Sequence, residues 1–353
     1  MLDEEVVPMT RTSTTPATGE IPHTDSTPGV YDVIVVGGGA AGLSGALTLA
    51  RARRSVLVVD AGRPRNAPAA HMHGYLSRDG ENPAALLAAG RGEVTAYGGR
   101  ITQGTVEAAT PLPDGGFEVR LEDGRDLRAR QLLVTTGLVD ELPAVPGVAE
   151  RWGKDVLHCP YCHGWEVRDQ AVGILATSPM ALHQAQMWRQ WTDDVTLFLH
   201  GSPAPDATTR AALDARGVRV VDALVEALDV QDDALHGVRL VSGEVVPCAA
   251  LVVAPRFTAR SAVLESLGIE TAEQVVDGTV VGTYVPSDPM GATTLPGVRV
   301  AGNVTNVMAQ VVAAAAAGVQ AAAATNGDLI ADDVRRAVVP GTLDGPQAAT
   351  AKG

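Results

Sequence analysis

The sequence predicts an α/β protein with two doubly wound, three-layer domains, and three observations support this prediction. A buried strand, a glycine-rich turn, a helix and a second strand ending in an acid follow one another between residues 31 and 60. The order of strand, turn, helix and strand recurs between residues 171 and 199. Ala, Val and Gly dominate the composition and aromatic residues make up only 3%. Small side chains of this kind let helices pack closely on sheets.

The first unit contains a dinucleotide fingerprint. Residues 31–36 form an apolar run bounded by turn residues, which predicts a buried strand. Gly37, Gly39 and Gly42 follow directly and open a helical pattern, and Asp60 ends the next strand. A Gly-x-Gly-x-x-Gly turn is a weak indication alone, but this position between strand and helix, with the later acid, is its confirming context.

Each residue of the fingerprint has a physical role. Gly37 would allow a tight turn, Gly39 would let the backbone approach a pyrophosphate, and Gly42 would let the helix pack against the strand. The helix N-terminus favours negative charge, and Asp60 would accept hydrogen bonds from a ribose. We therefore expect a Rossmann-like dinucleotide site, the alternative being a glycine turn without a ligand. The predicted cofactor-binding residues here are Gly37, Gly39, Ala40, Ala41, Gly42, Asp60 and Ala61.

The remaining elements complete both domains. Hairpin-like segments between residues 105 and 130 and a strand at 131–137 precede the second unit. Three short strand-like runs follow it, and then a strand and an alanine-rich helix to about residue 324. The predicted organisation is a disordered tail at 1–29, a nucleotide-binding domain in two segments at 30–143 and 255–335, an inserted domain at 144–254, and a flexible tail at 336–353.

Charge and composition exclude several classes of function. The formal net charge of −14 repels nucleic acid and anionic membranes. No apolar run is long enough to span a membrane, and the acidic start of the chain is unlike a secretory signal. Three cysteines in 353 residues form no disulfide framework. A reducing, cytoplasmic compartment is the expectation, and a close cysteine pair there is more often catalytic or metal-binding than structural.

Cys159 and Cys162 are separated by two residues and flanked by His158 and His163. A structural zinc site needs about four ligands, and the only other cysteine, Cys248, lies in an apolar strand pattern. A redox dithiol needs two cysteines at this spacing, and a nearby proton donor such as histidine favours its chemistry. We therefore predict a redox pair and no metal, the alternatives being zinc and a merely packed pair.

With these motifs the chain resembles the low-molecular-weight thioredoxin reductases of the pyridine nucleotide-disulfide flavoprotein family, from about residue 31 to about residue 324. The turn at Thr135, Thr136 and Gly137 resembles their second short motif, and Gly302-Asn303 resembles their Gly-Asp motif. The resemblance implies FAD as cofactor, Cys162 next to the flavin, Cys159 as the exposed interchange thiol, and a homodimer. The further FAD-binding residues that it implies are Thr136, Gly137, Gly302, Asn303, Gln310 and Val311.

The second nucleotide turn departs from that family. Ala176 and Ser178 stand where it has turn glycines, and Pro179 removes a backbone N–H from the helix start. The place of its His-Arg-Arg reads Leu199-His200-Gly201, without the arginines that pair with a 2′-phosphate. The turn is therefore expected not to bind a nicotinamide nucleotide, the alternative being a divergent site that still binds NADPH.

His163 is the other departure, since reductases usually have an acid there. Histidine can move protons near neutral pH, and Cys-x-x-Cys-His-Gly is similar to the dithiol oxidases of the gliotoxin and holomycin type. Those relatives lack a working nicotinamide site and pass electrons to oxygen. The roles of His71, His73 and His158 stay open. Met187, Trp188 and Trp191 lie at helical spacing and are expected to be packing residues.

The predicted function is an FAD-dependent thiol–disulfide oxidoreductase. The favoured form is a dithiol oxidase, in which Cys159, Cys162 and His163 are catalytic, the substrate is a small-molecule or peptide dithiol, and O2 is the acceptor. The first alternative is a reductase for thioredoxin or a similar partner that draws electrons from NADPH or another donor. The second is an FAD-loaded redox sensor without turnover.

Overall fold

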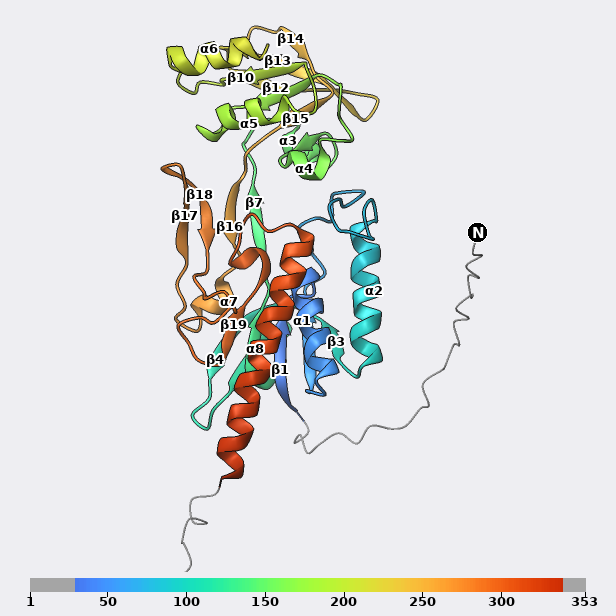
Figure 1. The fold of residues 1–353 in the computed structure, drawn as a ribbon, viewed down its shortest axis with the longest axis vertical. Coiled ribbons are helices and arrows are strands. Elements are labelled where there is room, and N and C mark those ends of the chain that lie inside the picture. The colour runs from blue at the N-terminus through green and yellow to red at the C-terminus, as the bar shows by residue number, and fades with distance from the viewer. Residues whose placement is uncertain (1–28, 339–353) are drawn as a thin grey trace, which may run out of the picture.

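The computed structural model describes residues 29–338. The two expected tails lie outside the described residues, apart from Gly29 and residues 336–338. Figure 1 shows a lower body that contains both ends of the described chain and an upper body formed by its middle part. No helix within residues 29–338 combines the length and the apolar character needed to cross a membrane.

The lower body is built on a seven-stranded sheet. Its strands run in the order β3-β2-β1-β6-β5-β4, and β19 also pairs with β6. Strands β1, β2, β3, β6 and β19 are parallel, and β4 and β5 are antiparallel additions. The bounds are β1 Val30–Val36, β2 Val56–Asp60, β3 Arg100–Gln103, β4 Val106–Pro111, β5 Phe117–Leu121, β6 Asp126–Val134 and β19 Val298–Val300.

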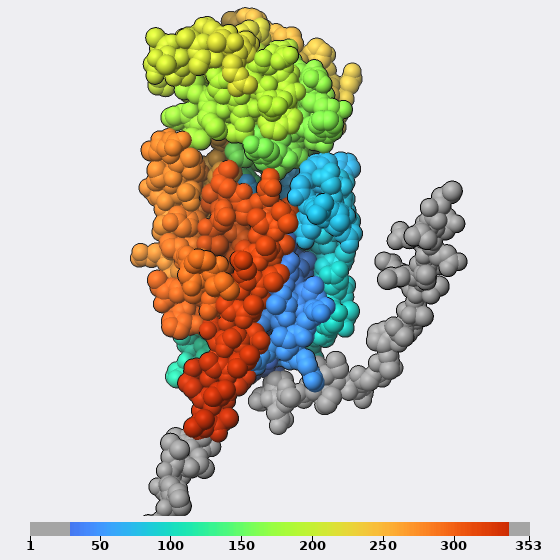
Figure 2. Space-filling view, viewed as in Figure 1, coloured from blue at the N-terminus to red at the C-terminus, as the bar shows by residue number. Residues whose placement is uncertain are grey.

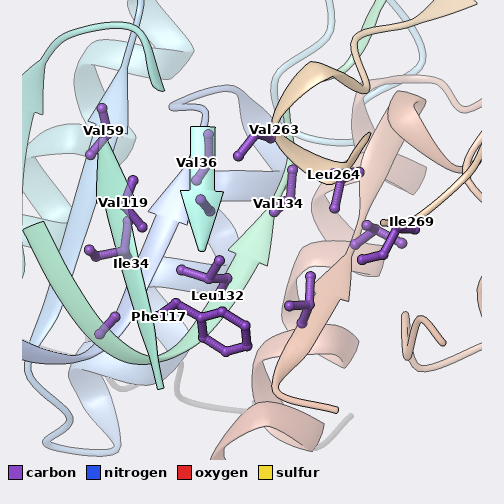
Figure 3. Packing of buried hydrophobic residues seen from close by; sticks show 14 of the residues in the cluster. Ile34, Val36, Val59, Phe117, Val119, Leu132, Val134, Val263, Leu264 and Ile269 are labelled. Atoms are coloured by element: carbon purple, nitrogen blue, oxygen red, sulfur yellow. The ribbon is translucent and has the colours of Figure 1, made fainter. Parts of the chain in front are cut away.

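The two faces of this sheet have different partners. Val33 and Val35 of β1 pack in one cluster with helices α1 (Ala40–Arg51), α2 (Pro83–Ala96) and α8 (Val311–Ala337). Ile34 and Val36 point to the opposite face and pack with side chains of β4, β5 and α7 (Ala262–Glu265), as Figure 3 shows. Alternate side chains of one strand therefore separate a helical layer from a β layer.

A second sheet in the lower body marks where the chain leaves and returns. It has the order β17-β18-β16-β7, and β7 pairs antiparallel with β16. The chain leaves the lower body after β7 and comes back at β16, so the two connections are hydrogen-bonded neighbours. The predicted domain boundaries, which stay predictions, lie next to these strands. The bounds are β7 Leu138–Glu141, β16 Arg256–Ala259, β17 Ala272–Val276 and β18 Thr279–Tyr284.

The upper body repeats the layered plan around a five-stranded parallel sheet of order β11-β10-β9-β15-β8. Helices α5 and α6 pack on one face, and the antiparallel strands β12, β13 and β14 pack on the other. The bounds are α3 Val148–Arg151, β8 Val156–Leu157, α4 Pro160–His163, β9 Val172–Leu175, α5 Met180–Trp188, β10 Val195–Phe198, α6 Ala207–Ala215, β11 Arg219–Val221, β12 Val225–Gln231, β13 Ala234–Leu240, β14 Val245–Pro247 and β15 Ala250–Val252.

The α/β class with two three-layer, Rossmann-like units is confirmed, whereas some element ends differ from prediction. Helix α8 continues to Ala337 instead of ending near residue 324. Ion pairs anchor its extension, because Asp332 lies 2.8 Å from Arg130 and Asp333 lies 2.8 Å from Arg54. Helix α5 ends at Trp188, whereas the sequence pattern predicts a helix that extends to Trp191, because the chain turns there to enter β10.

Candidate active site

One cavity of about 1750 Å³ joins the glycine turn of the lower body to the cysteines of the upper body. In Figure 2 the middle of the chain, in green, sits directly above the upper end of α8, in red. Every predicted site residue except Gly42 lines this cavity. They are Gly37, Gly39, Ala40, Ala41, Asp60, Ala61, Thr136, Gly137, Cys159, Cys162, His163, Gly302, Asn303, Gln310 and Val311.

The glycines of the first turn have two roles: some allow close packing of the chain, and one exposes backbone to the cavity. Gly37 has φ +107°, and a Cβ there would lie 2.6 Å from the carbonyl oxygen of Thr135. A Cβ on Gly42 would lie 1.9 Å from the oxygen of Gly37, so this residue sets how closely α1 approaches. Gly39, the N-cap of α1, has no atom within 4 Å of a would-be Cβ and lines the cavity.

Gly38 also contributes to this turn, although it is not a position of the Gly-x-Gly-x-x-Gly motif. A Cβ on it would lie 2.5 Å from the carboxylate of Asp60, so its lack of a side chain lets that carboxylate reach the turn. Asp60 also accepts a hydrogen bond from the backbone N–H of Gly62 at 3.1 Å. The run of three consecutive glycines was the available indication.

The second rim of the cavity comes from the C-terminal part of the chain. The amide nitrogen of Asn303 donates hydrogen bonds to the carbonyl oxygens of Asn306, at 3.0 Å, and Ala309, at 2.9 Å. A carboxylate cannot donate, so an aspartate at this position would lose both bonds. Gln310 follows as the N-cap of α8. The departure from Gly-Asp to Gly-Asn therefore fixes the turn that leads into α8.

These features fit an FAD molecule. Two helix N-termini, of α1 and α8, open onto the cavity, and helix N-termini favour the negative charge of a pyrophosphate. Arg63, Arg65 and Arg260 also line it. Arg65 forms a bidentate ion pair with Asp140, with nitrogen–oxygen distances of 2.7 and 2.8 Å. No sequence motif indicates these arginines, because they come from loops.

The cysteine pair lies on the short helix α4, with Cys159 as its N-cap. Both cysteines are free thiols and half-buried. The thiol of Cys162 donates to Cys159, and the backbone N–H groups of Cys162 and Tyr161 add to this, which lowers the pKa of Cys159 to about 6. The same contact and burial raise the pKa of Cys162. The side-chain nitrogen of Gln310 lies 3.9 Å from the Cys162 sulfur.

Two histidines beside the cysteines are neutral near pH 7. Burial lowers the pKa of His163, while Glu166 opposes and His73 reinforces this shift. Burial also lowers the pKa of His158, whose Nδ1 lies 3.0 Å from the carbonyl oxygen of Val253. His158 therefore anchors the cysteine segment to the end of β15, whereas His163 lines the cavity next to Cys162 in the chain.

His73 links the two bodies, a contact that the sequence did not reveal. Its Nε2 lies 3.3 Å from Glu166, which follows α4, and its Nδ1 lies 3.4 Å from Asp79 of its own loop. His71 instead makes a hydrogen bond of 3.0 Å with the carbonyl oxygen of Gly80 and stays within the loop. Glu166 lies three residues beyond His163, and this position was the only indication in the sequence that Glu166 could lie near the cysteines.

The second nucleotide-type turn is occupied by contacts within the chain. The hydroxyl of Thr177 donates to the carbonyl oxygen of Ala254 at 3.1 Å. Pro179, which has no N–H, is the N-cap of α5. At the end of the next strand, Nδ1 of His200 accepts the backbone N–H of Val225 at 3.0 Å. The Thr177 hydroxyl and Nδ1 of His200 therefore already have partners within the protein.

Within residues 29–338 no group of three or more His, Cys, Asp or Glu side chains is arranged to hold a metal ion. Cys248 lies apart from the pair, in the core between the parallel sheet and β12–β14. Burial raises the pKa of its thiol to about 12. This thiol therefore stays protonated near neutral pH, and Cys248 is not among the residues that line the cavity.

Comparison with known proteins identifies the class of protein that this fold and site define. The family model described as pyridine nucleotide-disulphide oxidoreductase matches residues 31–318, and the chain belongs to this family. Thioredoxin reductase aclD of Aspergillus oryzae is 32% identical over 76% of this chain and 86% of its own length. Thioredoxin reductase tcpT of Claviceps purpurea is 39% identical over 50% of this chain, a match that spans only 58% of that relative.

Solved structures agree with this assignment. The crystal structure of HlmI is 48% identical, with a TM-score of 0.82 over 89% of this chain and 97% of that one. An oxidoreductase from Agrobacterium tumefaciens is 37% identical, with a TM-score of 0.79 over 85% of this chain and 98% of that one. The chain is thus a thioredoxin reductase-like FAD flavoenzyme that carries out thiol–disulfide exchange.

Proposed function

We propose that this flavoenzyme is a dithiol oxidase, which converts a small-molecule or peptide dithiol into its disulfide with O2 as electron acceptor. One observation carries the proposal. The cysteine pair and the glycine cradle share one cavity, whereas the second turn, at residues 176–179, has no glycine, contains Pro179 without an N–H, and directs the Thr177 hydroxyl to Ala254. This contrast supports electron transfer from thiols to the flavin rather than from a nicotinamide nucleotide.

The cysteines complete the exchange with balanced atoms and electrons. A substrate thiolate attacks the Cys159 sulfur of the oxidised pair, the Cys159–Cys162 bond breaks, and a mixed disulfide forms. The second substrate thiol attacks this bond, releases Cys159 as a thiolate, and leaves as the oxidised product. The low pKa of Cys159 makes it a good leaving group in this second step. Two substrate S–H groups have then been oxidised and the cysteine pair reduced.

His163 serves as the proton acceptor in this scheme. A histidine whose pKa is lowered by burial is neutral near pH 7 and can take the proton of Cys162 as its electrons leave. When bound, FAD supplies the redox chemistry that takes two electrons from the cysteine pair and gives them to O2, yielding hydrogen peroxide.

A thioredoxin-type reductase is the second candidate, favoured by the names of the curated relatives, tcpT and aclD. It would use the same cysteines in the opposite direction and would need NADPH or another donor. A redox sensor without turnover is the third. The homodimer and the reducing, cytoplasmic compartment stay predictions.

An anaerobic titration of the purified yellow protein separates these candidates. The flavin band at about 450 nm is followed while NADPH, NADH and then dithiothreitol are added. The oxidase predicts bleaching by the dithiol alone, and return of colour with formation of peroxide when air is admitted. Rapid bleaching by NADPH would contradict it and favour the reductase. Bleaching by dithiol without repeated turnover in air would favour the sensor.

A further inference from the structure

The side chain of Gln310 reaches from the lower body to the cysteine pair of the upper body. Its nitrogen Nε2 lies 3.9 Å from the Cys162 sulfur, although the two residues are 148 positions apart in the chain. Both residues line the same cavity, in the region where the upper end of α8 faces the middle part of the chain (Figure 2). This contact with sulfur is separate from the FAD contact that the resemblance to thioredoxin reductases implies for Gln310.

The position of Gln310 is fixed by its neighbours in the lower body. It is the N-cap of α8, and the residue before it, Ala309, accepts a hydrogen bond of 2.9 Å from the side chain of Asn303. The oxygen of the Gln310 amide lies 3.7 Å from the place that a Cβ on Gly74 would occupy. The amide therefore has its oxygen beside Gly74 and its nitrogen, which donates hydrogen bonds, beside Cys162.

The two cysteines receive help from different bodies. Backbone N–H groups of α4 donate to Cys159 and belong to the same body as the pair. Cys159 and burial raise the pKa of Cys162, while the Gln310 amide and the charge of Arg65 oppose this rise from the lower body. Arg65 is already paired with Asp140. Among the described residues, Gln310 is therefore the side chain of the lower body that donates to Cys162.

A donor at this sulfur favours the reduced state of the pair. Reduction of the Cys159–Cys162 disulfide adds two electrons and breaks the S–S bond. With uptake of one proton it leaves one thiol and one thiolate near neutral pH, because the pKa of Cys159 is about 6. Hydrogen bonds to a charged acceptor are stronger than those to a neutral one, and a disulfide sulfur carries no charge. An amide N–H at Cys162 therefore stabilises the reduced pair more than the disulfide.

We propose that Gln310 is a catalytic residue contributed by the lower body, whose side-chain N–H stabilises negative charge on Cys162 and thereby raises the reduction potential of the cysteine pair. A higher potential makes the disulfide a stronger oxidant of substrate thiols. Because Gln310 and Cys162 belong to different bodies, this stabilisation depends on the arrangement of the two bodies seen here. The inference rests on the proposed function, in which Cys159 and Cys162 form the redox pair.

Equilibrium titration of the cysteine pair tests the inference. The holoenzyme is equilibrated without oxygen, at about pH 8, in mixtures of reduced and oxidised dithiothreitol. Free thiols are then trapped with N-ethylmaleimide, and mass spectrometry gives the disulfide fraction. Loss of one charge-assisted hydrogen bond predicts that Gln310→Leu lowers the equilibrium constant for reduction about tenfold, which corresponds to a potential about 30 mV lower. Gln310→Glu keeps the shape but adds a negative charge, and should lower the constant further. Gln320→Leu, at an exposed position of α8, is the matched control and should equal wild type.

The outcomes separate this inference from the function on which it rests. If the wild-type pair forms no reversible disulfide in any mixture, the proposed redox function is contradicted and the inference is overturned with it. If the wild-type disulfide forms but Gln310→Leu keeps its equilibrium constant, only the role of Gln310 is overturned. A wild-type constant in Gln310→Glu would show that shape matters and the N–H does not, and would also overturn it. Should Gln310→Leu fail to fold or lose its flavin, Gln310→Met, of similar length but without an N–H, decides. The same tenfold decrease is expected there, and an unchanged constant overturns the inference.

Discussion

The two strand–turn–helix–strand units of this chain share a topology and differ in what their turns can do. In the first, β1 leads through Gly37–Gly39 into α1, and the turn presents backbone to the cavity. In the second, β9 leads through residues 176–179 into α5, which begins one residue after Pro179. The side chain of Thr177 there bonds to the neighbouring strand end.

The fold alone therefore does not define a nucleotide site. Both turns stand at the carboxyl end of a parallel sheet, where α/β proteins bind ligands. The first turn keeps its backbone bare and its helix N-terminus open. The second has lost that chemistry, while the segment just before its unit carries Cys159 and Cys162 into the same cavity. Under the proposed function, the first unit would hold the cofactor, and the segment before the second unit would bring the thiols to it.

Substitutions in the first turn should have the largest effect, because this turn is expected to hold FAD. A methyl group on Gly39 meets no protein atom within 4 Å, so Gly39→Ala should keep the fold, at a cost of about 1 kcal/mol for a poorer N-cap. It should still weaken FAD binding by about 100-fold, because the methyl group occupies the cradle. Flavin release during gel filtration and thermal unfolding of the apoprotein measure the two effects separately.

Two matched variants make this prediction specific. Gly42→Ala, whose methyl group would lie 1.9 Å from the Gly37 oxygen, should lose both FAD and about 3 kcal/mol of stability. Gly92→Ala, at an exposed and uncrowded position of α2, should keep its flavin. If Gly39→Ala stays yellow with unchanged affinity, the first turn is not the pyrophosphate site.

Cys159 and Cys162, which precede the second unit in the chain, offer the next test. The first cause of the low pKa of Cys159, about 6, is the hydrogen bond from Cys162. A lowered pKa means that the reactive thiolate persists down to about pH 6, so alkylation of the reduced enzyme by iodoacetamide should be half-maximal there. Removing the donor in Cys162→Ala should move this midpoint upward, toward the ordinary cysteine value of about 8.5.

Cys162→Ser is the control, since its hydroxyl can still donate and should preserve part of the shift. Mass spectrometry of the alkylated Cys159 peptide at several pH values gives the midpoint for each variant. Equal midpoints in wild type, Cys162→Ser and Cys162→Ala would mean that Cys162 does not activate Cys159 and that the helix N-terminus acts alone.

Local sequence predicted those parts of the molecule that depend on local chemistry. The glycine turn and the cysteine pair each lie within a few residues, and their spacing alone indicates what they can bind or do. Strands β14 and β17 were missed because they are short. Strand β12 has seven residues and was missed because its residues show little apolar alternation. The length of α8 depends on arginines such as Arg130, about 200 residues earlier in the chain, and no helical pattern contains that information.

The site was likewise predictable only where it depends on local sequence. Residues of the glycine turn and of the cysteine pair line the cavity. The long-range pairs near it, Arg65 with Asp140 and His73 with Glu166, join segments that only the fold brings together.

The smallest expected effect concerns His200, at the strand end where the family's nicotinamide-binding members have arginines. Here Nδ1 of His200 accepts the N–H of the buried Val225, and its φ is +48°. His200→Ala should therefore lower the free energy of unfolding by about 1 kcal/mol, measured by urea denaturation, with flavin colour and thiol turnover unchanged. His200→Asn, which tolerates a left-handed backbone and can accept a hydrogen bond, should recover part of the loss. If His200→Ala instead left stability intact and altered a response to NADPH, the second turn would still be a nucleotide site and the contrast between the two units would fail.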